Sequence, residues 1–382
     1  MSPPAGPPTR GSSAARKRLD TLFRLLLLPG IGPVRLRDLV RRHGSPEAAL
    51  GSDDPDVARA RAALVEKPGL AGRIGRAITT VERLGIRVLT LGGPAYPERL
   101  LHLHDPPFCL FALGDLSLLE RPLVGVVGTR GHTEYGGEMA RLLAAGLSRA
   151  GVVVVSGLAR GIDGLAHGAS LAGGTVAVLG CGVDVVYPRE HARLQALIGR
   201  QGLLLSEFLP GEPPDTYRFP QRNRLIAALA RAIVVVEAGA KSGALSTARH
   251  AADLGRDIMA VPGRADRATS VGTNALIRDG SRLVTGPGDV LEELGLPGRS
   301  ETVGPRGGAP SDAGRGLSAD PLWRTLRDEP RPLDDIAAAA GLEPGRALAG
   351  LLALELEGHA RQLPGGRFAR AQSQNLGTAT RV

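Results

Sequence analysis

Short apolar runs alternate with amphipathic, helix-like segments through the middle of the chain. These runs are apolar on both faces, which is typical of strands buried between two layers of helices. The pattern therefore predicts an α/β domain over residues 92–296, with a mostly parallel sheet and helices on both of its faces. The predicted strands are Leu123–Val127, Val152–Val155, Thr175–Leu179, Leu203–Ser206, Ala232–Val236 and Asp257–Val261.

The segment before this domain has a different pattern. Residues 1–18 are rich in Pro, Gly, Ser and Ala and have almost nothing to bury, so we expect a disordered lead. Apolar residues then recur at helical spacing, which predicts a small all-helical domain over residues 19–91. Its turn at Leu28–Val34 has the form of a helix–hairpin–helix motif, and it is compatible with a phosphate contact or with plain helix packing.

The C-terminal part predicts a second, smaller folded unit. Residues 297–317 are rich in Gly, Pro, Ser and Thr, as in a linker, and residues 373–382 are predicted to be a tail. Between them, over residues 318–372, three helical segments precede a hairpin pattern. Three helices followed by a β-hairpin are typical of a winged-helix domain.

Charge points to a polyanionic partner, because the formal net charge is +9 at pH 7. The cations are almost all arginine, however, and such a skew also follows from genomic base composition. The predicted third helix of the winged-helix domain carries Glu355 and Glu357 against Arg346. That helix is therefore compatible with either a protein or a DNA partner.

Nothing in the sequence predicts export or a membrane span. The apolar run Leu25–Leu28 is far shorter than the ~20 residues that a transmembrane helix needs. The two cysteines, Cys109 and Cys181, cannot form a disulfide framework and match no spaced set of metal ligands. We therefore expect a cytoplasmic protein.

Three glycine-rich turns follow predicted strands and precede predicted helices, at residues 128–131, 156–168 and 237–243. Free backbone N–H groups at the start of a helix favour an anion, and glycine lets a phosphate approach the main chain. Because the carboxyl ends of parallel strands share one edge of a sheet, we expect the three turns to line one cleft.

None of these turns is a standard nucleotide-binding motif. The second turn lacks the spacing of a dinucleotide fingerprint, and the third, with Lys241-Ser242, lacks the glycines of a P-loop. His167 lies one helical turn after Asp163, as expected of a histidine on a packed helix face. The sequence therefore predicts no cofactor, no metal ion and no catalytic set.

The segment Phe219–Arg224 is predicted to open a helix, and it combines an aromatic ring, two guanidinium groups and an amide. Single-stranded nucleic acid needs a cationic surface for its backbone and flat groups for its bases. Aromatic residues make up only 3% of the chain, so backbone contacts are expected to dominate and sequence preference to be slight.

The order of several motifs resembles that of the DNA-processing protein A family, DprA or Smf. The motifs are VGTR at 127–130 with Tyr135-Gly136, SGLARGIDGLAHG from Ser156, LGCGVDVVYP at 179–188, SEF from Ser206, FPQRNRLIA from Phe219, VVVEAGAKSGALSTA from Val234 and VPG from Val261. The resemblance spans nearly the whole chain. It implies a helical N-terminal domain, an extended Rossmann-like parallel-sheet domain and a C-terminal winged-helix domain.

The resemblance also implies an activity. Family members bind incoming single-stranded DNA in the cytoplasm, protect it from nucleases and load the RecA recombinase during natural transformation, without catalysis. They generally dimerise through the Rossmann-like domain, and two linked sites raise avidity on long strands. We therefore expect a homodimer that needs no cofactor.

The matching motifs imply a DNA-binding set in which Arg130 binds a phosphate, Arg160 lines the adjacent pocket with two glycines, the other cations extend a basic track, and Phe219 either stacks on a base or only packs. The implied residues are Gly128, Thr129, Arg130, Gly157, Arg160, Gly161, Phe219, Arg222, Asn223, Arg224, Lys241 and Ser242. Thr129 stands where serine is common in the family, and its hydroxyl can replace that of serine. His191 stands where the family usually has asparagine, so no contact is inferred at that position.

An enzyme is the alternative hypothesis. Nucleotide phosphoribohydrolases of the lysine-decarboxylase-like group have a related Rossmann core and a glycine-rich turn followed by a catalytic glutamate. Glu237, at the end of a predicted strand, invites this comparison. The PGG-x-GT-x-x-E signature of those enzymes is absent, so we rank this hypothesis below DNA binding.

Overall fold

The computed structural model describes residues 13–65, 69–296, 321–327, 329–356, 359–363 and 366–370. These residues form two compact units, one within residues 1–300 and the other within residues 301–382. Within the described ranges, no helix has both the length and the apolar character needed to cross a lipid bilayer.

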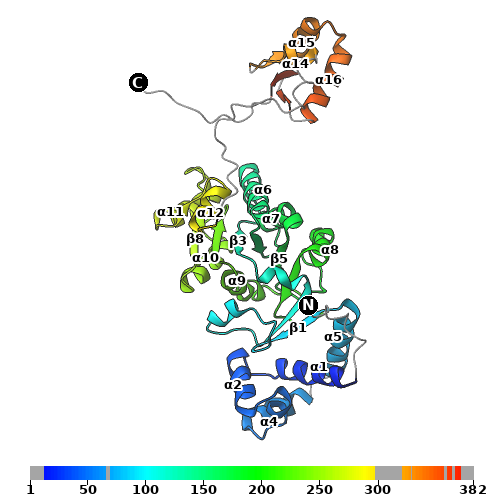
Figure 1. Cartoon of the computed structure of the whole chain (residues 1–382), viewed down its shortest axis with the longest axis vertical. Helices are drawn as coiled ribbons and strands as arrows, with labels where there is room; N and C mark the ends of the chain where they lie inside the picture. Colours follow the sequence, from blue (N-terminus) through cyan, green and yellow to red (C-terminus); the bar gives the residue numbers. More distant parts are fainter. Residues whose placement is uncertain are drawn as a thin grey trace, which may run out of the picture. The chain divides into compact units, whose positions relative to one another are not determined.

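Helices form the N-terminal part of the first unit, as the sequence predicts, and they gather beside strand β1 (Figure 1). They are α1 (Ser13–Leu26), α2 (Pro33–His43), α3 (Pro46–Gly51), α4 (Pro55–Val65) and α5 (Leu70–Leu84). Their apolar faces share one core with residues of the sheet. Phe23 of α1, for example, meets Phe111 of the sheet edge-on, with the ring centroids 5.7 Å apart.

The first helix begins earlier than predicted. Residues 1–12 of the predicted lead, 1–18, lie outside the described residues, but α1 already begins at Ser13. One turn into this helix, the guanidinium of Arg16 pairs with Glu82 of α5 at 2.8 Å. This tertiary contact orders a segment whose composition alone predicts no structure.

One nine-stranded sheet forms the centre of the first unit, with the strand order β1-β2-β6-β5-β4-β3-β7-β8-β9 (Figure 1). The strands are β1 (Arg87–Thr90), β2 (Cys109–Gly114), β3 (Leu123–Val127), β4 (Val153–Ser156), β5 (Thr175–Val178), β6 (Leu203–Ser206), β7 (Ala232–Val235), β8 (Asp257–Ala260) and β9 (Arg282–Leu283). Strands β3 to β9 pair in parallel, as predicted. Strand β2 pairs antiparallel with both β1 and β6.

The antiparallel strands correct the predicted boundary of the helical domain, because β1 lies inside the range 19–91. It pairs with β2 from Arg87 opposite Ala112 to Thr90 opposite Cys109. β1 reads Arg-Val-Leu-Thr and is buried at only one position, so it lacks the continuous apolar run that marks the parallel strands. Its partner β2 supplies the hydrogen bonds that make it a strand.

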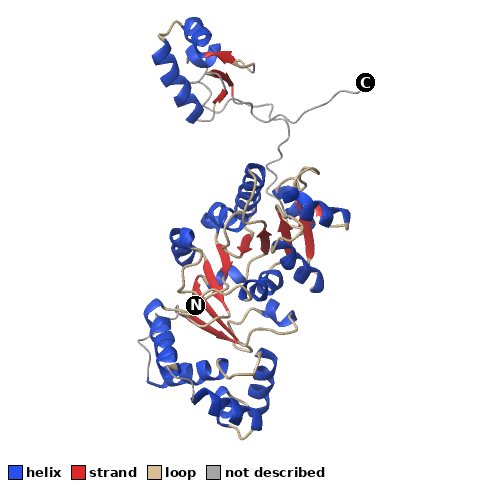
Figure 2. Cartoon of the chain, turned by 180° about the vertical axis from the view of Figure 1, so that it is seen from behind, coloured by secondary structure: helices blue, strands red, loops and turns tan. Residues whose placement is uncertain are grey.

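Successive residues of a strand point to opposite faces of the sheet, so each strand feeds two cores. In β3, Leu123 and Val127 join the core beneath α9 and α10, whereas Val124 and Val126 join the core beneath α6 and α7. The helices that cover the sheet are α6 (Glu134–Arg149), α7 (Ile162–Ser170), α8 (Ala192–Gln201), α9 (Arg218–Leu229), α10 (Ala244–Asp253), α11 (Val271–Arg278) and α12 (Pro287–Glu293). Figure 2 shows helices on both sides of the strands.

The second unit is the predicted winged-helix domain. It contains α14 (Pro321–Thr325), β10 (Arg331–Pro332), α15 (Leu333–Ala340), α16 (Pro344–Leu356), β11 (Ala360–Leu363) and β12 (Arg367–Arg370). The strands form a sheet in the order β10-β12-β11, and Leu326, Ile336, Leu351 and Phe368 are buried in its own core. The predicted linker, 297–317, and tail, 373–382, lie outside the described residues.

Candidate nucleic-acid interface

Strands β4, β3 and β7 are neighbours in the sheet, and their carboxyl ends lead into the three glycine-rich turns. As the sequence predicts, residues of these turns line one pocket, which has a volume of about 530 Å³ and also includes the first turns of α9 and α10. From the predicted set this pocket contains Gly128, Thr129, Arg130, Phe219, Arg222, Asn223 and Ser242. A second pocket of about 330 Å³ shares Arg130, Phe219 and Arg222 with the first, and it adds Gly157 and Arg160.

The turn after β3 presents Arg130 to the pocket. Its backbone is tied to the neighbouring turn, since the N–H of Thr129 donates to the carbonyl of Glu237 at 2.7 Å. The Thr129 hydroxyl in turn accepts the N–H of Gly131 at 3.3 Å. Arg130 itself is exposed, and no carboxylate of the described residues pairs with it. Its positive charge is therefore available to an anion.

The turn after β4 lies close to the turn after β3. Gly161 has a φ of +75°, and a Cβ at this position would collide with the carbonyl oxygen of Thr129. A Cβ at Gly157 would collide with the guanidinium of Arg222. Both glycines are therefore required by the packing of the turn, and neither needs a ligand contact to explain its identity.

Arg222 forms the floor of the site. It is only 4% exposed, and its Nη1 donates to the carbonyl of Gly157 at 2.6 Å and also to the carbonyl of Val178. Burial lowers the pKa of Arg222 to about 10, and the charge of nearby Asp163 opposes this shift. The predicted role of Arg222 in an exposed basic track is therefore corrected: it lines both pockets, but its hydrogen bonds are used to join the ends of β4 and β5.

The structure does not bring Arg224 to the site, which corrects a second prediction. Arg224 is 5% exposed and pairs with Glu207 and, at 3.4 Å, with Asp105. Successive residues of a helix are rotated by about 100°, so Arg222 and Arg224 point in different directions from α9. Asn223 does line the larger pocket, where its amide donates to the carbonyl of Gly243 at 3.4 Å.

The remaining two predicted cations differ in their surroundings. Arg160 lines the smaller pocket and pairs through its Nε with Glu190, and the two side chains are 64% and 46% exposed. Lys241 is exposed on the loop between β7 and α10, but it is not among the residues that line either pocket, although its neighbour Ser242 is.

An aromatic stack stands between the two pockets. The rings of Phe219 and Tyr187 are stacked with centroids 5.4 Å apart and an interplanar angle of 27°. The guanidinium of Arg130 lies over the Phe219 ring. Tyr187 was not predicted as a site residue, although it lies in the LGCGVDVVYP motif. Its role depends on a contact with Phe219 that only the fold creates.

Two titratable groups beneath the second turn are structural. Asp163 accepts the N–H groups of Gly157, at 3.1 Å, and Ala159, at 3.3 Å, and burial raises its pKa. His167 is fully buried, its Nδ1 contacts the Thr175 hydroxyl at 2.8 Å, and burial lowers its pKa to about 3. His167 is therefore neutral at physiological pH, in agreement with its predicted role as a packed histidine.

Glu237, the residue that suggested an enzyme, is not among the residues that line either pocket. Its Oε2 accepts the N–H of Thr133 at 2.9 Å and the Thr133 hydroxyl at 3.2 Å, and its side chain is buried. Thr133 also caps α6 by accepting the N–H of Gly136 at 3.1 Å. Glu237 therefore holds the start of α6. No group of three His, Cys, Asp or Glu side chains in the described part of the chain is placed to hold a metal ion.

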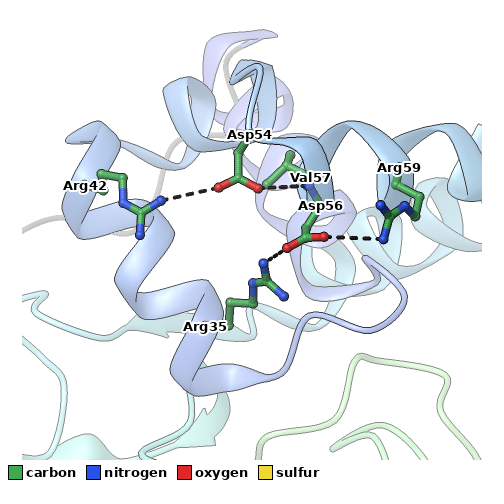
Figure 3. Close-up of polar contacts among 6 residues, drawn as sticks. All are labelled: Arg35, Arg42, Asp54, Asp56, Val57 and Arg59. Atoms are coloured by element: carbon green, nitrogen blue, oxygen red, sulfur yellow. Dashed lines mark hydrogen bonds and ion pairs between the residues drawn. The ribbon is translucent and has the colours of Figure 1, made fainter.

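The helical part of the first unit neutralises two of its own arginines (Figure 3). Arg35 of α2 pairs with Asp56, and Arg42 pairs with Asp54 at 3.4 Å, both at the start of α4. Asp54 also accepts the N–H of Val57 at 3.3 Å. These contacts favour helix packing over phosphate binding for the glycine turn that precedes α2.

In the winged-helix domain, one of the acidic residues noted in the sequence has a structural partner. Glu355 accepts the N–H of Gln362 at 2.8 Å and so joins α16 to β11. Glu357 lies outside the described residues. Arg361 and Arg367 are exposed on the hairpin strands β11 and β12, and Arg370 lies over the Trp323 ring at 4.7 Å.

Comparison with known proteins adds a family to this geometry. Residues 87–295 match the family described as DNA recombination-mediator protein A, and residues 309–366 match the DprA winged helix domain. The chain is 41% identical over 283 residues to Protein Smf of Escherichia coli, covering 72% of this chain and 76% of that protein. It is 38% identical over 374 residues to a putative DNA processing protein DprA of Mycobacterium tuberculosis, covering 92% of each.

Solved structures agree with the sequence comparisons. DNA processing protein A from Streptococcus pneumoniae superposes with a TM-score of 0.63 and 34% identity, covering 72% of this chain and 97% of that one. The corresponding protein from Helicobacter pylori, which binds single-stranded DNA, superposes with a TM-score of 0.50 and 33% identity, covering 55% of this chain and 95% of that one.

Proposed function

Because the chain belongs to the DNA recombination-mediator protein A family, whose members are named DprA or Smf, we propose that it binds single-stranded DNA at the two joined pockets and delivers it to the RecA recombinase during DNA uptake. The similar protein from Helicobacter pylori binds single-stranded DNA, which supports this function.

The observation that carries the proposal is the arrangement around Arg130. An exposed guanidinium without a carboxylate partner in the described chain lies beside the stacked rings of Phe219 and Tyr187. A cation for the backbone next to flat groups for the bases is the combination that single strands require. We propose that contacts to the sugar–phosphate chain and to base faces dominate, and such contacts carry no sequence information, which supports binding without sequence preference.

The test is fluorescence anisotropy with labelled oligo-dT, the same length of duplex and single mononucleotides, over a range of salt concentrations. We expect single strands to bind best, with an affinity that falls steeply as salt rises. Arg130→Ala should weaken binding by about 1 to 3 kcal/mol, as expected for the loss of a charged hydrogen-bonded contact. Equal affinity for duplex would contradict the proposal.

We also propose that the site binds DNA without a chemical step and without a cofactor. The exposed Glu190 is paired with Arg160, and the two acidic residues within the turns, Glu237 and Asp163, are buried and hydrogen-bonded to backbone N–H groups. Neither can approach a bound strand as a general acid or base without breaking those bonds. Release of ribose phosphate from a nucleotide by the purified protein would favour the enzyme hypothesis instead.

Delivery to the recombinase is proposed to take place in the cytoplasm and from a homodimer. Leu283, an apolar side chain of the edge strand β9, is 44% exposed, which supports pairing of two copies there. Leu283→Glu should then yield a monomer in sedimentation analysis and weaken binding of long but not short oligonucleotides. Loading itself is tested by the rate at which RecA hydrolyses ATP on protein-coated single strands.

A further inference from the structure

A third pocket, with a volume of about 770 Å³, lies between the start of α6 and the loop that follows β8. Two motifs noted in the sequence, Tyr135-Gly136 and Val261-Pro262-Gly263, have no role in the site described above, and they meet here. The Tyr135 hydroxyl donates to the carbonyl of Pro262 at 3.2 Å, and both residues line the pocket.

The far wall of this pocket is held firmly in place. Asn274 of α11 accepts the N–H of Gly263 at 3.1 Å and donates to its carbonyl at 2.9 Å. The N–H of Gly272 donates to the carbonyl of Ala238 at 2.7 Å, which ties α11 to the turn after β7. The loop is therefore fixed by side-chain and backbone contacts, and the pocket is a built part of the sheet edge.

The pocket offers an aromatic ring and one available cation. Tyr135 remains 48% exposed even though its hydroxyl is bonded, so part of its ring is open to a ligand. Arg264 and Asp266 bond to each other through two hydrogen bonds of 2.9 Å. The Arg267 side chain is exposed, and its guanidinium makes no ion pair or hydrogen bond with the described residues, whereas its backbone bonds to Arg264 and Ser270. Glu134 also lines the pocket, and its carboxylate together with that of Asp266 offsets the charges of Arg264 and Arg267.

The pocket is also close to the strand-binding site. Tyr135 follows Arg130 by five residues, which limits the distance between their Cα atoms to about 18 Å. Strands β3, β7 and β8 are neighbours, so the turns that carry these residues lie along one edge of the sheet. A strand of a few nucleotides bound at Arg130 can therefore reach Tyr135.

We propose that this pocket is a second subsite for the same single strand, where the Tyr135 ring stacks on a base and Arg267 binds the adjacent phosphate. The inference rests on the proposed function and gives the strand a path, from Arg160 past Arg130 to Tyr135. Because the charge of the pocket is nearly balanced, base stacking carries more of the binding here than at Arg130.

The test measures affinity against oligonucleotide length, from dT4 to dT20, for the full chain and four variants. Tyr135→Leu should weaken binding of the long oligonucleotides about 5-fold or more and leave the shortest unchanged. Tyr135→Phe, which keeps the ring, should bind within about 2-fold of the natural protein. Arg267→Ala should weaken the binding of long strands more than the control variant Arg149→Ala does. The control removes an exposed arginine at the opposite end of α6.

A fluorescent base gives a second readout. An oligonucleotide with 2-aminopurine at successive positions should show one position whose fluorescence is quenched on binding and recovers in Tyr135→Leu. If the natural protein binds single strands and Tyr135→Leu matches it at every length, the subsite is wrong and the proposed function stands. If the natural protein binds no oligonucleotide of any length, the proposed function itself is contradicted.

Discussion

The guanidinium carbon of Arg130 lies 5.4 Å from the centroid of the Phe219 ring. Arg130 comes from the turn after β3 and Phe219 from the first turn of α9, so the contact joins two segments that are far apart in the sequence. Arg130 lines both pockets and stays exposed while its planar cation packs against the ring.

This contact predicts that lysine cannot fully replace Arg130. Arg130→Lys keeps the charge but loses the planar group that stacks on a ring, so its affinity for oligo-dT should lie between those of the natural protein and Arg130→Ala. Phe219→Leu should weaken binding by about 0.5 to 1 kcal/mol through the same contact. If Arg130→Lys binds oligo-dT as tightly as the natural protein in anisotropy titrations, positive charge alone is sufficient for the contact with DNA.

Arg224 is predicted to matter for stability and not for binding. Removing its guanidinium leaves Glu207 buried without its partner, so Arg224→Ala should destabilise the protein by about 3 to 5 kcal/mol in urea unfolding. At temperatures where the variant remains folded, its affinity for single strands should be unchanged. Asn223→Ala, the adjacent substitution on the pocket side, should instead leave stability nearly intact and reduce affinity.

Glu190 is predicted to compete with DNA for Arg160, because its carboxylate pairs with the Arg160 Nε and offsets the charge that would attract a phosphate. Exposed ion pairs are weak, so Glu190→Gln should tighten binding of oligo-dT by only about 2- to 5-fold, and less at high salt. Glu82→Gln is the matched control, since it frees the exposed Arg16 in the same way and adds the same charge within the helical part of the chain. Equal tightening by both variants would mean that net charge alone is responsible.

His167 makes stability depend on pH. Burial lowers its pKa to about 3, whereas an unfolded histidine titrates near 6.5. Stability is therefore present above pH 6.5 and is lost as the pH falls towards 3, because only the unfolded chain takes up the proton. Between pH 7 and 5 this group should remove about 2 kcal/mol from the free energy of unfolding. His167→Gln should reduce that difference; an unchanged pH dependence would show that other groups cause it.

The central sheet is predictable because its strands form a repeated pattern. The predicted parallel strands are mostly apolar on both faces, and glycine-rich turns follow three of them, β3, β4 and β7, so the sheet and the shared location of these turns follow from the sequence. Strand β1 and the start of α1 depend instead on partners distant in sequence, Ala112 opposite Arg87 and Glu82 beside Arg16. No local pattern contains that information.

The sequence predicts which segments form the candidate site, but it does not predict which side chains of those segments face it. Arg222, Asn223 and Arg224 were all expected to extend the basic track, yet their helix directs Arg222 into the protein beneath the turns and Arg224 towards Glu207. Buried arginine is uncommon, so residue type suggested exposure for both. Tyr187 was missed because a tyrosine beside a proline indicates only a turn. Its stacking on the Phe219 ring is visible only in the folded structure.

Arg222, hydrogen-bonded to the carbonyls of Gly157 and Val178, makes the floor of the site rigid before any strand arrives. The conformational entropy lost when the complex forms must then come mainly from the nucleic acid, which gives up the freedom of its sugar–phosphate torsions. Strands that are already extended, for instance under tension or while emerging from a narrow channel, should be captured more readily than strands free to coil.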